Sequence, residues 1–180
     1  EDILFQSKKK NWTIIRPYIT YNSNRFQLGV YEKETWLKRA IEGRTILFPL
    51  DIAKSYTTLT YGEDVAYILS LILGNVKSLG EVYNIVTDET HTWQEILDEY
   101  CEIIYDIWGL HPKIKYIDES ESMQNYWGSS WQIKYDRLIN RKFDNGKIKA
   151  LVGNYNFTDS FTGLRKSLKA FSLNPVYSGG

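Results

Sequence analysis

The sequence predicts an α/β fold, with a small, mostly parallel sheet and flanking helices, from three observations. Short apolar segments rich in β-branched residues have the length and composition of buried strands. Segments between them carry apolar residues at helical spacing, and glycines stand where several of these helices should end. Strands that alternate with helices in this way are typical of a parallel sheet, because parallel neighbours need a long connection between them.

The expected elements follow one another in this alternating order. We expect strands at residues 12–15, 45–48, 56–61, 82–86 and 113–117. We expect helices at residues 30–41, 63–73, 92–108, 145–152 and 160–171. Residues 118–141 show no clear period and are predicted to be irregular with one short helix at most.

The clearest helix boundary is a capping box at Thr92 and Glu95. In such a box each of the two side chains satisfies a free backbone amide at the start of the helix. Gly109 then marks the expected end of this helix, as a residue that adopts the left-handed conformation without strain. At the start of another helix, Glu63 and Asp64 place negative charge near the positive end of the helix dipole.

Composition and charge exclude several classes of protein. The chain has 180 residues, enough for one ordinary domain, and its hydrophobic share of 43% excludes a disordered protein. Basic and acidic residues balance at 22 each, which disfavours nucleic acid and anionic membranes as partners. There is one cysteine, and no apolar run has the length of a membrane span. We therefore expect a cytoplasmic location.

Motifs that would carry chemistry alone are missing from the sequence. Two histidines and one cysteine show no metal-ligand spacing, so we predict no metal site. No Gly-x-Ser-x-Gly elbow marks a nucleophile, and no Gly-x-Gly-x-x-Gly or Walker loop could hold phosphates. We assign no catalytic residue.

A series of weak motifs in a fixed order carries more information than any one of them. An apolar strand ends in Arg16-Pro17 and is followed by Tyr21, and a Thr-rich segment runs into Gly62-Glu63-Asp64 and an apolar helix. The remaining members are Gly80-Glu81-Val82-Tyr83-Asn84-Ile85, the capped helix with Trp93, Phe143-Asp144-Asn145-Gly146-Lys147-Ile148 and Gly163-Leu164-Arg165. This series resembles the second half of the extended short-chain dehydrogenases, the NAD-dependent nucleotide-sugar epimerase and dehydratase family, over residues 12–171.

The resemblance implies that residues 1–180 form the carboxy-terminal, substrate-binding portion of an extended Rossmann-type enzyme. The family's Tyr-x-x-x-Lys pair and glycine-rich loop do not occur in these 180 residues, so we expect the amino-terminal dinucleotide-binding domain to be absent from the chain. The intact parent would use NAD or NADP for isomerase or lyase chemistry on a nucleotide sugar. The chain alone is expected to be inactive and to bind neither cofactor.

The resemblance also suggests which residues would touch the ligands. Pro17 and Tyr18 would lie along the nicotinamide of the cofactor. The expected substrate-binding residues are Tyr21, Arg25, Thr57, Asn84 and Trp127. Thr57 stands where the family usually has an arginine, so another cation would have to bind the diphosphate: Arg25, Lys38, Arg39 or Arg44. Arg25 is the preferred one, because its loop is expected next to the edge that meets the cofactor.

Structural roles compete with these functional ones. Arg16 fits an ion pair better than a substrate contact, Asp64 fits the stabilisation of its helix start, and Trp93 and Trp108 fit the core. For the chain as a whole, the alternative is a non-catalytic module that binds a sugar nucleotide or RNA. The expected partners are the nucleotide sugar, the missing domain and a second copy of the chain, because removal of that domain would expose apolar surface.

Overall fold

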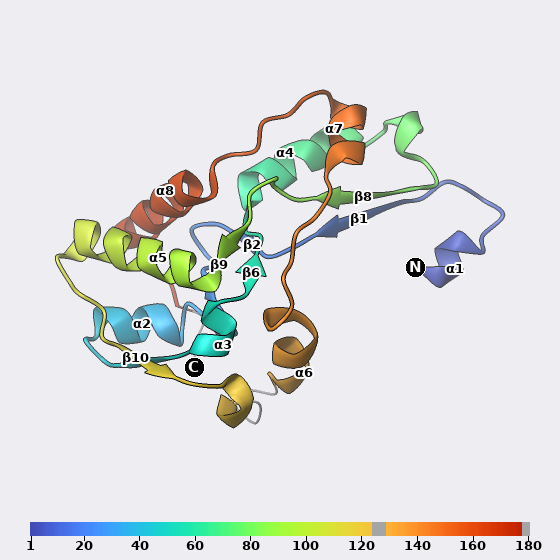
Figure 1. Cartoon of the computed structure of the whole chain (residues 1–180). Coiled ribbons are helices and arrows are strands. Elements are labelled where there is room, and N and C mark those ends of the chain that lie inside the picture. Colours follow the sequence, from blue (N-terminus) through green and yellow to red (C-terminus); the bar gives the residue numbers. More distant parts are fainter. Residues whose placement is uncertain (124–128, 178–180) are drawn as a thin grey trace.

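The structure of the chain, a computed structural model, describes residues 1–123 and 129–177 (Figure 1). Within these residues the strands form five two-stranded sheets, and three of the five pairings are parallel. Helices flank them, so the expected α/β class with small, mostly parallel sheets is confirmed. None of the helices in this part of the chain is long and apolar enough to cross a membrane.

The parallel pairs join strands that are distant in sequence. They are β1 (Thr13–Pro17) with β8 (Glu81–Ile85), β5 (Ile46–Pro49) with β10 (Ile114–Ile117), and β2 (Thr20–Tyr21) with β7 (Thr60–Tyr61). The antiparallel pairs are β3 (Gln27–Leu28) with β4 (Tyr31–Glu32) and β6 (Tyr56–Thr57) with β9 (His91–Thr92). The prediction of one strand over residues 56–61 was wrong, because β6 and β7 pair in different sheets.

The helices and helical turns are α1 (Asp2–Phe5), α2 (Trp36–Ile41), α3 (Leu50–Ala53), α4 (Gly62–Ile72), η1 (Val76–Ser78), α5 (Trp93–Trp108), η2 (Ser120–Met123), α6 (Ser130–Gln132), η3 (Ile133–Arg137), α7 (Gly146–Val152) and α8 (Ser160–Leu173). The capping box of α5 is confirmed, since the Glu95 amide donates to the Thr92 hydroxyl at 3.1 Å and the Thr92 amide donates to the Glu95 carboxylate at 2.7 Å. Gly109 ends this helix in the left-handed conformation, as expected.

The larger of two hydrophobic cores lies among α2, α3, α5 and α8, and we call this part of the molecule the body (Figure 1). Aromatic rings fill its centre. The Trp36 and Tyr100 rings lie 4.4 Å apart, and Phe26 contacts Tyr100 and Phe171 edge to face. Trp93 is also buried in this core, as predicted. The body therefore surrounds its core with helices and strands.

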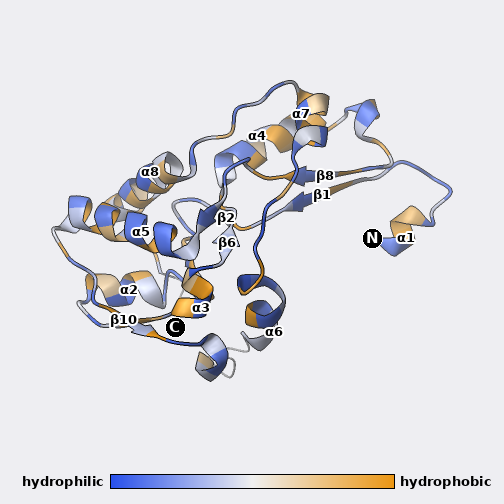
Figure 2. Ribbon diagram, in the orientation of Figure 1, coloured by the Kyte–Doolittle hydropathy of each residue, from blue (hydrophilic) through white to orange (hydrophobic). Residues whose placement is uncertain are grey.

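The smaller core belongs to β1, β8, α4 and α7, which we call the arm. Its buried residues are Val65, Ile68, Ile72, Tyr83, Ile85 and Ile148. Both helices lie on one side of the β1–β8 pair (Figure 1), and Figure 2 shows hydrophobic segments in all four elements. Ile14 pairs with Val82 in the register of the two strands, and Ile15 pairs with Tyr83. Successive side chains of a strand point to opposite faces, so Ile14 and Val82 lie on the other face from Ile15 and Tyr83. Ile14 and Val82 remain half-exposed. The arm thus buries only one face of its strand pair.

Two charged residues of the arm have the structural roles expected for them. Asp64, in the first turn of α4, accepts hydrogen bonds from the Tyr155 hydroxyl at 2.8 Å and the Thr158 amide at 2.7 Å. These bonds tie α4 to the segment before α8. Arg16 pairs with Glu1, with 2.9 Å between its Nε and the carboxylate.

Candidate functional site

The β3–β4 hairpin lies between two features that together form the candidate site. Tyr31 from this hairpin lines a cavity, while Gln27 and Gly29 from the same hairpin accept hydrogen bonds from a buried arginine. The hairpin stays close to both features because its residues belong to the core of the body, where Leu28 is fully buried.

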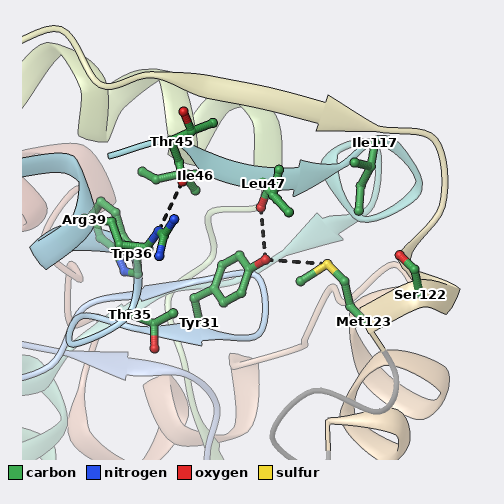
Figure 3. Close-up of a pocket in the computed structure, with 10 residues that line it drawn as sticks. All are labelled: Tyr31, Thr35, Trp36, Arg39, Thr45, Ile46, Leu47, Ile117, Ser122 and Met123. Atoms are coloured by element: carbon green, nitrogen blue, oxygen red, sulfur yellow. Dashed lines mark hydrogen bonds between the residues drawn. The ribbon is translucent and has the colours of Figure 1, made fainter. Parts of the chain in front are cut away.

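The cavity has a volume of about 330 Å³ and lies between α2, β5 and the start of the segment after β10 (Figure 3). The Tyr31 hydroxyl donates to the Leu47 carbonyl at 3.0 Å and lies 3.5 Å from the Met123 sulfur. Arg39 donates from Nε to the Thr45 carbonyl at 3.1 Å. The lining residues are Tyr31, Thr35, Trp36, Arg39, Thr45, Ile46, Leu47, Ile117, Ser122 and Met123. Mostly apolar walls with a few polar groups at the edge suit a planar ring.

Arg137 is the most deeply buried charged group on the other side of the hairpin, with 2% of its surface exposed. Its Nε donates to the Gly29 carbonyl at 2.7 Å, and its Nη2 donates to the Gln27 side-chain oxygen at 3.0 Å. The guanidinium also lies 5.4 Å from the Trp93 ring centre and pairs with Asp136. Burial lowers the pKa of Arg137, and the neighbouring Asp136 carboxylate opposes this effect.

Asp136 accepts hydrogen bonds from three side chains. The Tyr18 hydroxyl donates to it at 2.7 Å, Arg141 donates from Nε at 3.0 Å, and Arg137 is the third donor. Burial and the Asp136 carboxylate raise the pKa of Tyr18 to about 12. Tyr18 is therefore a protonated donor at neutral pH and unsuited to act as a base.

Arg25 joins this network through Glu32. Its Nη2 donates to Glu32 at 2.9 Å, and the Gln27 amide donates to the same carboxylate at 3.0 Å. Since Gln27 also accepts from Arg137, a continuous chain of hydrogen bonds runs from Tyr18 to Arg25. The Arg25 side chain remains half-exposed.

The end of β1, where the cofactor was expected, leads into this network. Pro17 is exposed, and Ile19 has a φ of 28°, which a β-branched residue adopts only with strain. Thr57 is fully buried beside Tyr18, where its hydroxyl acts against the rise in the pKa of Tyr18. Among the described residues that hydroxyl makes no hydrogen bond of ordinary geometry.

The structure brings Tyr18, Arg25 and Thr57 into one region and places other expected site residues elsewhere. Tyr21 is 1% exposed in the core of the body, and its hydroxyl donates to the Ser160 carbonyl at 2.9 Å. Asn84 lies in the arm and donates to the Asp144 carbonyl at 3.1 Å. Trp127 lies outside the described residues. Groups of His, Cys, Asp and Glu that could hold a metal ion are absent from residues 1–123 and 129–177.

Comparison with solved structures reveals the same fold in enzymes of nucleotide-sugar metabolism. UDP-glucuronic acid 4-epimerase from Bacillus cereus, in complex with UDP-glucuronic acid and NAD, superposes with a TM-score of 0.60 at 17% identity. UDP-glucose 4-epimerase from Thermotoga maritima, with UDP-glucose, gives 0.65 at 17% identity. dTDP-glucose 4,6-dehydratase from Streptomyces venezuelae, with NAD bound, gives 0.60 at 18% identity.

The chain has the fold of the carboxy-terminal part of these enzymes. Each match covers 89% of this chain but only 45%, 46% and 44% of the three enzyme chains, in the order above. The chain thus spans less than half the length of the enzymes that it matches. No protein-family model matches the sequence, and no curated protein matches it either.

The sequence analysis missed several residues of the site, among them Asp136, Arg137 and Arg141. These three lie in and just after η3, a π-helical turn inside the segment that was predicted to be irregular. The signal available in the sequence was an adjacent Asp-Arg pair followed by a further arginine among scattered aromatic residues. Only the fold shows that these charges lie beside Tyr18.

Proposed function

We propose that the chain is the nucleotide-sugar-binding portion of an NAD(P)-dependent epimerase or dehydratase. The observation that carries the proposal is that the β3–β4 hairpin contributes to both parts of the site. It places a ring-sized cavity next to a network of guanidinium groups. A nucleotide sugar needs both, since its base is planar and weakly polar while its diphosphate carries negative charge. The fold shared with enzymes that were crystallised with such ligands supports the same conclusion.

In this proposal the cavity receives the base, with Tyr31 and Trp36 as its aromatic walls. Arg25, Arg137 and Arg141 provide the positive charge for the diphosphate, in place of the arginine that the family has at the position of Thr57. The remaining expected substrate-binding residues, Tyr21, Asn84 and Trp127, stay predictions. The polar groups of Tyr21 and Asn84 already make hydrogen bonds within the chain. In this proposal the two residues would therefore shape the substrate site through packing and strand position.

The dinucleotide would be held mainly by residues that this chain does not contain. The exposed end of β1 at Pro17 and the strained turn after it offer an open backbone edge that fits the nicotinamide side of such a cofactor. When bound, the cofactor accepts and returns a hydride. The Tyr18 hydroxyl stays protonated and donates a hydrogen bond to Asp136, so Tyr18 is not a base there, and we propose that the chain is inactive alone.

Calorimetric titration with UDP-, GDP- and dTDP-sugars, NAD and NADP tests the proposal. We expect one nucleotide sugar to bind and both dinucleotides to fail. Ser122→Trp should abolish binding, because Ser122 is exposed and lines the cavity, which the indole would fill. Ser70→Trp, on the exposed side of α4 in the arm, is the matched control and should bind normally. Equal binding by both variants would contradict the placement of the base.

The alternative function is a non-catalytic module that binds a sugar nucleotide or RNA. It is favoured by Thr57, whose buried hydroxyl replaces the positive charge that the family uses there. The coding sequence upstream of Glu1 separates the two proposals. A Tyr-x-x-x-Lys pair and a glycine-rich loop in frame would support the enzyme, whereas an unrelated segment would support the module. Titration with a short RNA then distinguishes the two ligands of the module.

A further inference from the structure

Asp136 has the surroundings of a bound phosphate oxygen rather than those of a surface carboxylate. Two guanidinium groups and a phenolic hydroxyl converge on it: those of Arg137 next to it, Arg141 in the coil after η3 and Tyr18 after β1. Arginine side chains and hydroxyl donors of this kind are the groups with which proteins bind phosphate. The same donors, without Asp136, would form an anion-binding site.

The two guanidinium donors have partners other than Asp136. Arg137 is anchored by the Gly29 carbonyl and by Gln27, and Arg141 also donates to the Tyr135 carbonyl. The Asp136 side chain itself is 24% exposed, so solvent and solutes reach it. It lies on the π-helical turn η3, a type of local irregularity that is frequent at functional sites.

The charges around Asp136 almost cancel. Within the network the guanidinium groups of Arg25, Arg137 and Arg141 face two carboxylates, Glu32 and Asp136. One net positive charge remains for a ligand that carries at least two negative charges. Removal of the Asp136 charge alone would double the net positive charge without moving a donor.

We propose that Asp136 is a built-in anion that occupies the phosphate-binding position of this site and must be displaced by a diphosphate ligand. The inference rests on the proposed function for the identity of that ligand, but the anion site can be tested without a sugar or a base. Asp136 lowers the affinity for the diphosphate by competing for its donors. While no ligand is bound, it accepts the hydrogen bonds of Tyr18 and both arginines.

Titration calorimetry with inorganic pyrophosphate tests this role. Asp136→Asn keeps the size of the side chain and removes its charge, and we expect it to bind pyrophosphate at least about tenfold more tightly than the wild type. The gain should shrink at high salt. The control is Asp118→Asn, which makes the same change of charge at an exposed position outside the network and should bind as the wild type does. Adding Arg141→Gln to Asp136→Asn should remove most of the gain.

The variant could lose stability, because Arg137 would keep a buried charge without its carboxylate partner. In this case the melting temperatures of both proteins are measured with and without pyrophosphate. Pyrophosphate should then raise the melting temperature of Asp136→Asn more than that of the wild type, or restore folding to an unfolded variant. The proposal is overturned if pyrophosphate binds a folded Asp136→Asn no more tightly than the wild type, or fails to rescue an unfolded one. If the variant gains pyrophosphate binding but no nucleotide sugar binds, the anion site stands and the proposed function fails.

Discussion

The body and the arm differ in how completely each covers its own core. In the body, α5, α8, α2 and α3 lie around a core that holds Trp36, Trp93 and Tyr100 almost without exposure. In the arm, α4 and α7 cover one face of the β1–β8 pair, and Leu73 and Val76 at its far end are 81% and 75% exposed. A sheet of two strands with one open face is marginal by itself. The body is the more self-sufficient of the two regions.

This difference bears directly on function. The cavity and the guanidinium network belong to the body, whereas the edge expected to meet the cofactor, at Pro17, lies at the end of an arm strand. The proposed nucleotide-sugar site therefore depends on the region with the complete core. The proposed cofactor contact depends on the region with an open face.

The largest effect is expected for Gly163→Ala in the body. A Cβ at Gly163 would lie 2.1 Å from the Tyr21 hydroxyl, which is fixed by its hydrogen bond to the Ser160 carbonyl. We expect the free energy of unfolding to fall by about 2–3 kcal/mol, measured by urea denaturation. In the Tyr21→Phe background the same substitution should cost about 1 kcal/mol less, because the clashing oxygen is gone.

Gly146→Ala in the arm is the matched control. A Cβ there would meet only the Asp144 carboxylate oxygen, at 3.1 Å. This oxygen, which accepts from the Gly146 amide at 2.7 Å, would have to shift by only a few tenths of an ångström. We expect a change within about 0.5 kcal/mol. Equal losses for the two alanine variants would contradict the contrast between a closely packed body and a looser arm.

A smaller effect is expected for Tyr18→Phe, at the junction of arm and body. The variant loses the hydrogen bond to the Asp136 carboxylate, which should lower the free energy of unfolding by about 1–2 kcal/mol at neutral pH. Tyr135→Phe, whose ring is half-exposed, should change it little.

The effect of Tyr18→Phe should also depend on pH. The pKa of Tyr18 is raised in the folded chain from 10.0 to about 12, so its neutral form is favoured by folding. The contribution of the Tyr18 hydroxyl to the free energy of unfolding is fully present below pH 10 and is lost as the pH rises toward 12. Denaturation curves at pH 7 and pH 11 should therefore show a smaller difference between Tyr18→Phe and the wild type at pH 11. A difference that does not change with pH would exclude the hydroxyl as its cause.

Smaller still is the effect expected for Arg165→Ala on α8. Arg165 faces three carboxylates of α5, with contacts of 2.7 Å to Glu99, 3.1 Å to Glu102 and 2.8 Å to Asp106. Most of these groups are well exposed, so we expect a loss of about 1 kcal/mol that decreases at high salt. Lys166→Ala breaks one exposed pair with Glu63 and should cost less than Arg165→Ala does. A loss that is independent of salt would point to packing instead of charge.

Local signals in the sequence predicted much of the fold. The capping box at Thr92 and the left-handed glycine at Gly109 are defined by neighbouring residues, so both ends of α5 could be predicted. The division of residues 56–61 into β6 and β7 could not be predicted in this way. It depends on partners far away in the sequence, since Thr57 pairs with His91 and Thr60 pairs with Thr20.

The candidate site was predictable only in part, for the same reason. Tyr18 and Arg25 follow a recognisable strand, and the resemblance to a known family marked them. Arg137 gave no such signal, because its segment has no period and its function depends on distant partners such as Gly29. Tyr21 shows the opposite case, in which a residue marked by the family pattern lies in the core.

Hydrogen exchange of the intact chain, with and without the nucleotide sugar that binds in the calorimetric panel, tests the central claim most directly. We expect the ligand to slow exchange in β3, β4 and β5 of the body and to leave the amides of β1 and β8 in the arm unchanged. Slower exchange in β1 and β8, with no change around the hairpin and the cavity, would contradict the account and place the ligand on the arm.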